Sequence, residues 1–218
     1  MKNLLEVQDL NIKYLSEKST IHAVKNLDFS LKENEICAFI GQSGCGKSSF
    51  GHAIIGLLDE NAKQSGKIIF ENINLLELCE KEKRKIRGKK ISMIFQDPFS
   101  YLNPTMKIGK QILEAIWDNP KKEKVYFLLN EVGFLDSVLR YNQYPHEMSG
   151  GMRQRVMIAI ALASNPKIII ADEPTTSLDL NTQMQFLKLL KKINKKYNTS
   201  IIFITHDITL ADAIASKI

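Results

Sequence analysis

The sequence lacks any apolar run long enough to cross a bilayer, because no hydrophobic stretch approaches the roughly 18 residues that such a span needs. Its first residues, Met1 to Glu6, introduce charge before an apolar signal-peptide core can form. Cysteine is also scarce: Cys37, Cys45 and Cys79 form no C-x-x-C pair, and we interpret them as reduced thiols. We therefore expect a cytosolic protein with no transmembrane segment of its own, whose role at a membrane comes through a partner.

What is present is an ordinary globular composition. The chain has 218 residues, of which 44% are hydrophobic and 25% charged, enough for one large domain or a core plus an insert. The net charge of +6 comes mostly from residues 81–90 and 191–196. In both segments the basic residues alternate with apolar positions, which favours solvated helix faces over a nucleic-acid patch. We therefore expect no nucleic-acid partner.

A glycine-rich turn is the most specific feature of the sequence. It follows the apolar run 36–40, a predicted strand, and precedes residues 49–58, where apolar positions have helical spacing. Glycines let backbone amides approach a ligand closely, and a helix N-terminus favours an anion, so this context predicts a phosphate-binding loop. Within it, Lys47 can reach the outer phosphates of a nucleotide and Ser48 can hold magnesium through its hydroxyl. The full motif reads Gly41-Gln42-Ser43-Gly44-Cys45-Gly46-Lys47-Ser48, with Ser49 next.

Polar residues also follow two further predicted strands. The apolar run 167–171 ends at Asp172 and Glu173, where α/β sheets place ligands. One carboxylate can hold Mg²⁺ while the other orients or deprotonates an attacking water. A capped strand end is the alternative interpretation. The last predicted strand, 200–205, ends at His206, which would usually be structural but here joins the same rim.

The rest of the chain supplies the framework. Residues 5–14, 22–31, 65–71 and 91–95 are predicted strands, and 100–148 is a mostly helical insert with predicted helices at 108–117, 122–132 and 135–141. Tyr14 ends the first strand, where its ring could stack on a base or lie half-buried. Ser149 is a predicted N-cap, and the Gly150-Gly151 pair after it is a second anion-binding device at a helix start.

The order of these pieces resembles the ATP-binding subunit of ABC transporters over nearly the whole chain. The resemblance implies an α/β P-loop NTPase with a RecA-like core, an N-terminal antiparallel β subdomain and an inserted α-helical subdomain. Residues 1–98 and 157–218 would form the β subdomain and the nucleotide-binding core, and 99–156 the helical insert with the signature motif. The family normally continues with closing strands past the switch histidine, which His206 matches, so we expect a truncated C-terminal end.

The resemblance also assigns roles, with ATP and Mg²⁺ as cofactors. It makes Glu173, His206 and Lys47 catalytic, and Ser48, Gln96 and Asp172 the metal-contacting residues. The expected nucleotide-binding residues are Tyr14, the glycine-rich loop from Gly41 to Ser49, Gln96, Ser149, Gly150, Gly151 and Asp179. By resemblance, Ser149, Gly150 and Gly151 match the signature motif of the family, which departs here from its general form at Met148 and Met152; the second change is usual in the branch described next.

The sequence motifs at Ile86-Arg87-Gly88, at residues 93–98 and at residues 146–156 are similar to those of the peptide and nickel uptake branch of this family. The expected partners are two permeases, a second ATP-binding subunit (a paralogue or a copy of this chain) and, indirectly, a solute-binding protein, at the cytoplasmic face of the membrane. Two alternatives stay open. One is a soluble ABC-type ATPase that acts on nucleic acid or the ribosome; the other is a non-catalytic regulatory relative.

Overall fold

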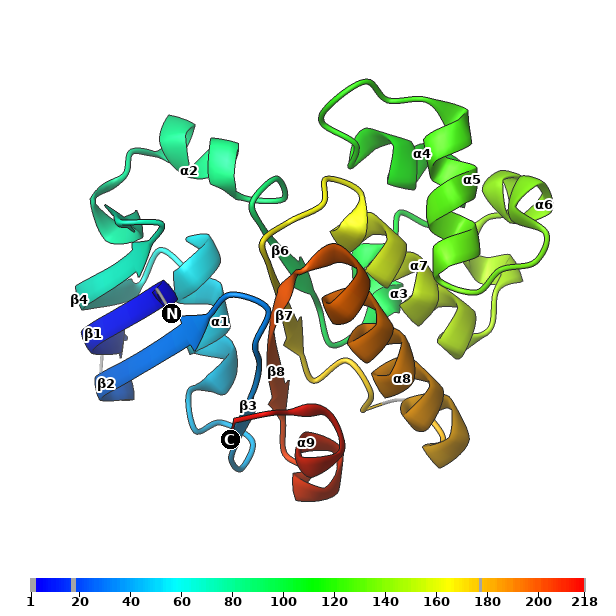
Figure 1. The fold of residues 1–218 in the computed structure, drawn as a ribbon. Coiled ribbons are helices and arrows are strands. Elements are labelled where there is room, and N and C mark those ends of the chain that lie inside the picture. Colours follow the sequence, from blue (N-terminus) through cyan, green and yellow to red (C-terminus); the bar gives the residue numbers. More distant parts are fainter. Residues whose placement is uncertain (1–2, 17–18, 177, 218) are drawn as a thin grey trace.

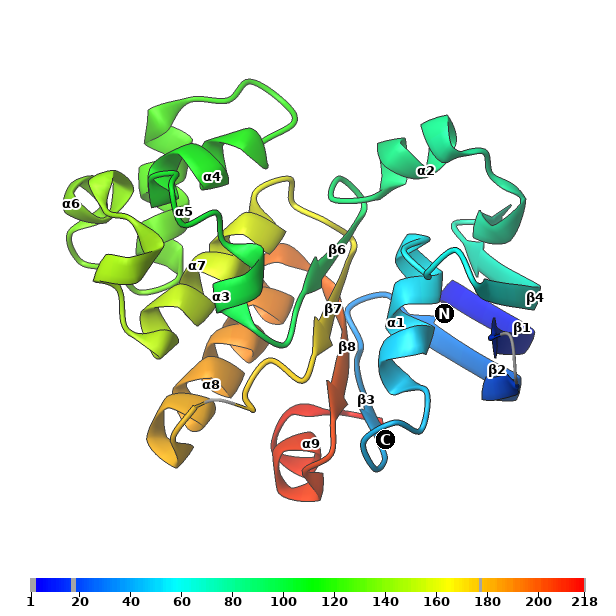
Figure 2. The same cartoon turned by 180° about the vertical axis from the view of Figure 1, so that it is seen from behind.

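The structure is a computed structural model that describes residues 3–16, 19–176 and 178–217. Within these residues it forms two four-stranded sheets with helices between and beside them (Figures 1 and 2). The N-terminal sheet is antiparallel, in the order β2-β1-β4-β5. Its strands are β1 (Asn3–Leu15), β2 (Thr20–Lys32), β4 (Ala62–Phe70) and β5 (Ile73–Asn74). The two long strands extend one to two residues beyond the predicted ranges 5–14 and 22–31 at each end.

The second sheet is parallel, in the order β3-β8-β7-β6. Its strands are β3 (Ile36–Ile40), β6 (Ile91–Ile94), β7 (Ile168–Asp172) and β8 (Ser200–Thr205). Every residue of β7 and β8 is buried. Continuous apolar runs of this kind are expected where helices or a second sheet cover both faces. The predicted α/β class is therefore confirmed, with an antiparallel N-terminal sheet beside a parallel core.

The parallel sheet separates two hydrophobic cores. Side chains alternate across a strand, so Ile168 and Ile170 of β7 pack with the antiparallel sheet and α1 (Lys47–Ile55). Ile169 and Ala171 point the other way, into a core with α7 (Gly150–Leu162), α8 (Leu180–Tyr197) and α9 (Ile208–Ile214). Figures 1 and 2 show α1 on one side of this sheet and α7, α8 and α9 on the other.

The helical region lies between β6 and β7 in the sequence. It contains α3 (Pro98–Tyr101), α4 (Ile108–Glu114), α5 (Lys122–Glu131), α6 (Ser137–Asn142), the 3-10 helix η2 (Pro145–Glu147) and α7. The predicted helices at 108–117, 122–132 and 135–141 correspond to α4, α5 and α6. The predicted boundary between residues 156 and 157 lies inside α7, which runs without a break from the glycine pair into the core. The division into subdomains at that point stays a prediction.

The basic segment before β6 forms the 3-10 helix η1 (Leu75–Glu77) and α2 (Glu80–Ile86). None of the residues of α2 is buried, as expected for a solvated helix face. In the second basic segment, Lys191, Lys192, Lys195 and Lys196 of α8 are exposed. Among the described residues, no helix combines the length and the apolar composition that crossing a membrane requires.

Candidate active site

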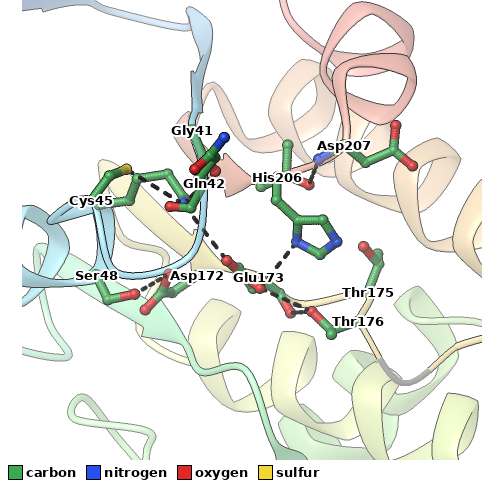
Figure 3. Close-up of polar contacts among 12 residues, drawn as sticks. Gly41, Gln42, Cys45, Ser48, Asp172, Glu173, Thr175, Thr176, His206 and Asp207 are labelled. Carbon is green, nitrogen blue, oxygen red and sulfur yellow. Dashed lines mark hydrogen bonds and ion pairs between the residues drawn. The ribbon is translucent and has the colours of Figure 1, made fainter.

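The polar residues predicted after the parallel strands gather at one edge of the sheet. The glycine-rich loop follows β3, His206 follows β8, Asp172 ends β7 with Glu173 next, and Gln96 lies two residues after β6. Because these four strands are parallel neighbours, their carboxyl ends lie side by side, where α/β folds bind ligands. Figure 3 shows the contacts among residues at the ends of β3, β7 and β8.

The glycine-rich loop has the backbone of an anion cradle. Gly44 and Gly46 have φ angles of 81° and 97°, a region that favours glycine. A Cβ at Gly46 would lie 2.1 Å from the Ala23 carbonyl oxygen, so no side chain fits there. Gly46 is the N-cap of α1, whose first residue is Lys47. The unpaired amides of this helix start therefore face the loop and favour negative charge.

Lys47 is buried, with 8% of its surface exposed. Its Nζ donates to the carbonyl oxygens of Gly41 at 2.6 Å and Gln42 at 2.8 Å, and lies 3.8 Å from Glu173 Oε1. These contacts fold the ammonium back over its own loop. A buried ammonium held by neutral carbonyls and one carboxylate is well placed to turn toward a more negative ligand.

Ser48 and Asp172 form a direct pair, because the Ser48 hydroxyl donates to Asp172 Oδ1 at 3.1 Å. Burial raises the pKa of Asp172 above its usual value, although the hydrogen bond from Ser48 opposes this shift. A hydroxyl and a carboxylate are hard oxygen donors of the kind that Mg²⁺ prefers. No group of three or more His, Cys, Asp or Glu side chains in the described residues could hold a metal ion by itself. The pair therefore fits a magnesium ion that takes its other oxygens from water and a phosphate ligand.

Glu173 connects the loop after β3 to the loop after β8. Its Oε2 lies 3.3 Å from His206 Nδ1 and accepts a hydrogen bond from Thr176 Oγ1, also at 3.3 Å (Figure 3). Its backbone amide donates to the Ile204 carbonyl at 2.9 Å, and its φ is 42°. The side chain is 11% exposed, whereas that of His206 is 52% exposed. The carboxylate is thus held from two directions near the surface of the site.

A pocket of about 330 Å³, here called the phosphate-loop pocket, opens beside this cluster. Tyr14 is part of its wall, and the Tyr14 hydroxyl and Ser49 Oγ are 3.0 Å apart, which fixes the ring next to the start of α1. The residues that line the pocket are Tyr14, Ile21, Ala23, Ser43, Gly44, Gly46, Lys47, Ser48, Ser49, Gln96 and Glu173. Sequence reasoning missed Ile21 and Ala23, which β2 brings here, and Thr176. Only the register of β1 with β2, in which Tyr14 pairs with Ile21, could have indicated Ile21.

The second predicted anion-binding device lies in a different place. Ser149 accepts a hydrogen bond from the Met152 amide at 3.3 Å, and Asp179 accepts one from the Thr182 amide at 3.0 Å, so both cap helices. Ser149 and Gly151 line a separate pocket of about 390 Å³, here called the signature pocket. Among the described residues, the lining of the phosphate-loop pocket does not include Ser149, Gly150, Gly151 or Asp179. One chain therefore carries two anion-binding devices that do not share a pocket.

The glycine loop, the carboxylate pair and the separate signature pocket on a parallel-sheet core define an ATP-binding cassette. Consistent with this, residues 24–176 match the family model described as ABC transporter, and the chain belongs to that family. Over 99% of its length it is 47% identical to the oligopeptide transport ATP-binding protein OppD of Bacillus subtilis. It is 44% identical, over its full length, to the dipeptide transport ATP-binding protein DppD of the same organism.

The chain spans 62% of the length of the first of these relatives and 68% of the second. Among solved structures, it is similar to a dimeric bacterial ABC transporter cassette, with a TM-score of 0.84 and 30% sequence identity. That match covers 95% of this chain and 90% of the other. The predicted family resemblance and fold are thereby confirmed.

Proposed function

We propose that this chain is the ATP-binding and ATP-hydrolysing subunit of a transporter that takes up peptides through partner permeases. The observation that carries the proposal is the convergence of Lys47, the Ser48–Asp172 pair and Glu173 at the rim of one pocket. Relatives that are named for oligopeptide and dipeptide transport support peptides as the solute. Nickel complexes, the other solute of the predicted branch, have no such support.

Nucleotide binding would use the phosphate-loop pocket. The amides between Gly41 and Gly46 and the start of α1 would hold the phosphates, and the Lys47 ammonium would move from the Gly41 and Gln42 carbonyls to the outer phosphate oxygens. The Tyr14 ring, held by Ser49, would stack on the base.

The metal-contacting residues would be Ser48, Asp172 and Gln96, which offer hydroxyl, carboxylate and amide oxygens. A bound magnesium ion would neutralise charge on the outer phosphates. Asp172 must be ionised to hold a cation, and the raised pKa that burial gives it means that its ionised form is held at a cost until a cation arrives.

Hydrolysis would depend on Glu173. Its carboxylate lies between the Lys47 ammonium and His206, so a water that donates to Oε2 would lie beside the outer phosphate. Glu173 would orient this water and accept its proton as the new oxygen–phosphorus bond forms, while the bond from the γ-phosphorus to the bridging oxygen breaks and ADP leaves with that oxygen. Thr176 and the backbone hydrogen bond to Ile204 keep the carboxylate in place, and His206 would donate to the γ-phosphate from the other side.

The separate signature pocket supports a second subunit. Ser149 is exposed at the start of α7, and a Cβ at Gly150 would meet nothing within 4 Å, whereas one at Gly151 would lie 2.8 Å from Thr182. We propose that these amides cover the ATP of a partner ATP-binding subunit, either a paralogue or a copy of this chain. Asp179, at the start of α8 beside this pocket, would lie at the same contact.

Contact with the permeases would occur next to Gln96. A groove of about 240 Å³, lined by Phe95 and Trp117 among others, lies between the parallel sheet and the helical region. A permease segment in this groove would sense movement of Gln96 and hold the chain at the cytoplasmic face of the membrane. A solute-binding protein would act on the permeases from the other side. The other two candidates are less well supported, because the matched relatives are transport proteins and all the reacting residues are present.

The test has two stages. Calorimetry with ATP and phosphate release by the purified chain would establish binding and turnover. The chain would then be co-purified with candidate permeases, and peptide-stimulated ATPase activity measured in the assembled complex. Absence of ATP binding would refute the proposal outright, and stimulation by nickel complexes instead of peptides would refute the solute.

A further inference from the structure

The Ile86-Arg87-Gly88 segment has no part in the nucleotide site, yet Arg87 makes three hydrogen bonds. Its Nε donates to the Ile55 carbonyl and its Nη2 to the Gly56 carbonyl, each at 2.9 Å. Its Nη1 donates to Glu80 Oε1 at 3.0 Å. The side chain is only 25% exposed. The guanidinium therefore joins the C-terminal end of α1 to the start of α2.

This contact fixes the end of the phosphate-loop helix. The last carbonyls of a helix lack partners within it. Gly56, with φ of 66°, turns the chain so that the Leu57 amide donates to the His52 carbonyl at 2.8 Å. Arg87 then supplies donors for two more carbonyls and a positive charge at the negative end of the helix. A planar fork that binds two carbonyls at once restricts both position and direction.

The other end of α1 is the phosphate loop itself. Lys47 and Ser48 are its first two residues, and Ile55 is its last. Nine residues at 1.5 Å each make a rod of about 13 Å. A helix this short moves as one body, so a shift of Lys47 or Ser48 toward a nucleotide also shifts the carbonyls that Arg87 holds.

The backbone next to Arg87 lies near Trp117. Gly88 has φ of 74°, and a Cβ there would lie 3.7 Å from the indole nitrogen of Trp117. The Lys89 ammonium lies 6.0 Å from the centre of the indole ring and 3.8 Å from Asp118. Trp117 is half-exposed and, with Arg87, Gly88 and Phe95, lines the groove described above. Hydrogen bonds thus join the phosphate-loop helix to Arg87, and Arg87 and Gly88 line the same groove wall as Trp117.

We propose that Arg87 is a positioning residue that couples the phosphate-loop helix to the groove wall at Trp117. Nucleotide binding at Lys47 and Ser48 changes the surroundings of Trp117 through Arg87, by a route separate from the segment that carries Gln96. The proposal rests on ATP binding as proposed above. This role accounts for the contacts of Arg87 and Gly88, which neither bind the nucleotide nor belong to the hydrophobic core.

The sequence contains a single tryptophan, so the emission of Trp117 reports on this wall directly. The purified chain is titrated with a nonhydrolysable ATP analogue and Mg²⁺ while emission is followed, and calorimetry gives the affinity independently. The wild type is expected to show an emission change that saturates with the calorimetric binding curve. Arg87→Met is expected to lose this change while it keeps its affinity for the analogue.

Arg84→Met is the matched control. Arg84 contacts the same Glu80, at 3.6 Å, but its side chain is 75% exposed and, in the described part of the chain, has no hydrogen bond to α1. This variant is expected to keep the full emission change. Arg87→Lys keeps the charge without the fork, so a reduced change is expected; this variant also serves if Arg87→Met does not fold.

The outcomes separate the two proposals. An unaltered emission change in Arg87→Met or, where that variant does not fold, in Arg87→Lys would overturn the coupling. A wild type that binds the analogue by calorimetry without any change in emission would also overturn it, and ATP binding would stand. A wild type that does not bind the analogue at all would remove both.

Discussion

Replacing Glu173 with glutamine tests the proposed chemistry at its centre. The change removes the negative charge and the proton-accepting capacity but keeps the shape of the side chain. The amide oxygen can still accept from Thr176 Oγ1, and the backbone hydrogen bond to Ile204 is untouched. We therefore expect Glu173→Gln to fold normally and to bind ATP at least as tightly, because a carboxylate no longer faces the phosphates.

Turnover should nearly stop. A positioned general base contributes about 10²- to 10⁴-fold to a rate, or about 3–5 kcal/mol in the activation barrier. Glu173 is the carboxylate that pairs with the Lys47 ammonium, at 3.8 Å. The loss should therefore appear in kcat, measured as phosphate release at saturating MgATP, with calorimetry to confirm binding.

Glu71→Gln provides the matched control for this experiment. It makes the same chemical change in a glutamate that also pairs with lysine, but far from the loop, next to Lys90 and Lys167. Its turnover should equal that of the wild type. If Glu173→Gln hydrolysed ATP within a few-fold of the wild-type rate, Glu173 would not be the base and the proposed mechanism would be wrong.

Three further outcomes follow from the same structure. Lys47→Ala should weaken ATP binding by about tenfold to a hundredfold, since hydrogen bonds to a charged group contribute about 1.5–3 kcal/mol; unchanged affinity by calorimetry would contradict this role. Gly150→Ala should leave the unfolding midpoint unchanged, because a Cβ there meets nothing within 4 Å, yet it should lower phosphate release if these amides cover a partner's ATP; wild-type turnover would count against the two-subunit site. Glu71→Gln should lower the free energy of unfolding at pH 7 by about 1 kcal/mol or less. The hydrogen bonds from Lys167 and Lys90 depress the pKa of Glu71. The stability that ionised Glu71 contributes is therefore fully present above the ordinary glutamate pKa and is lost as the pH falls through the depressed value. The urea midpoints of the wild type and of Glu71→Gln should therefore converge toward acid pH.

The elements that the sequence predicts best are those specified by local pattern. The strands at 36–40 and 200–205 have the predicted bounds, because each is a continuous apolar run that ends at glycine or at a polar residue. The gathering of the loop, Asp172, Glu173 and His206 at one edge also follows from local pattern. Once the strands are parallel neighbours, what comes after each of them must meet there.

The features that were missed depend on contacts between distant segments. Arg87 stands out in the sequence only as part of a branch motif, and its hydrogen bonds to carbonyls more than thirty positions earlier in the chain depend on the fold. Ile21 and Ala23 join the pocket only because β2 is placed beside the loop. The phosphate loop and the Ser149 segment have the same anion-binding character as sequences; only the family resemblance implied that they serve different ATP molecules, and they line separate pockets in the folded chain.

The left-handed backbone at Glu173 has a consequence for how this protein can change over time. A non-glycine residue in this region costs roughly 1–2 kcal/mol, and glycine or asparagine would relieve it. The substitutions that would make this position most heat-resistant are therefore ones that delete the carboxylate. A laboratory selection for thermostability alone, without selection for ATP turnover, should accumulate such replacements at this position and yield variants that are more stable but catalytically inactive.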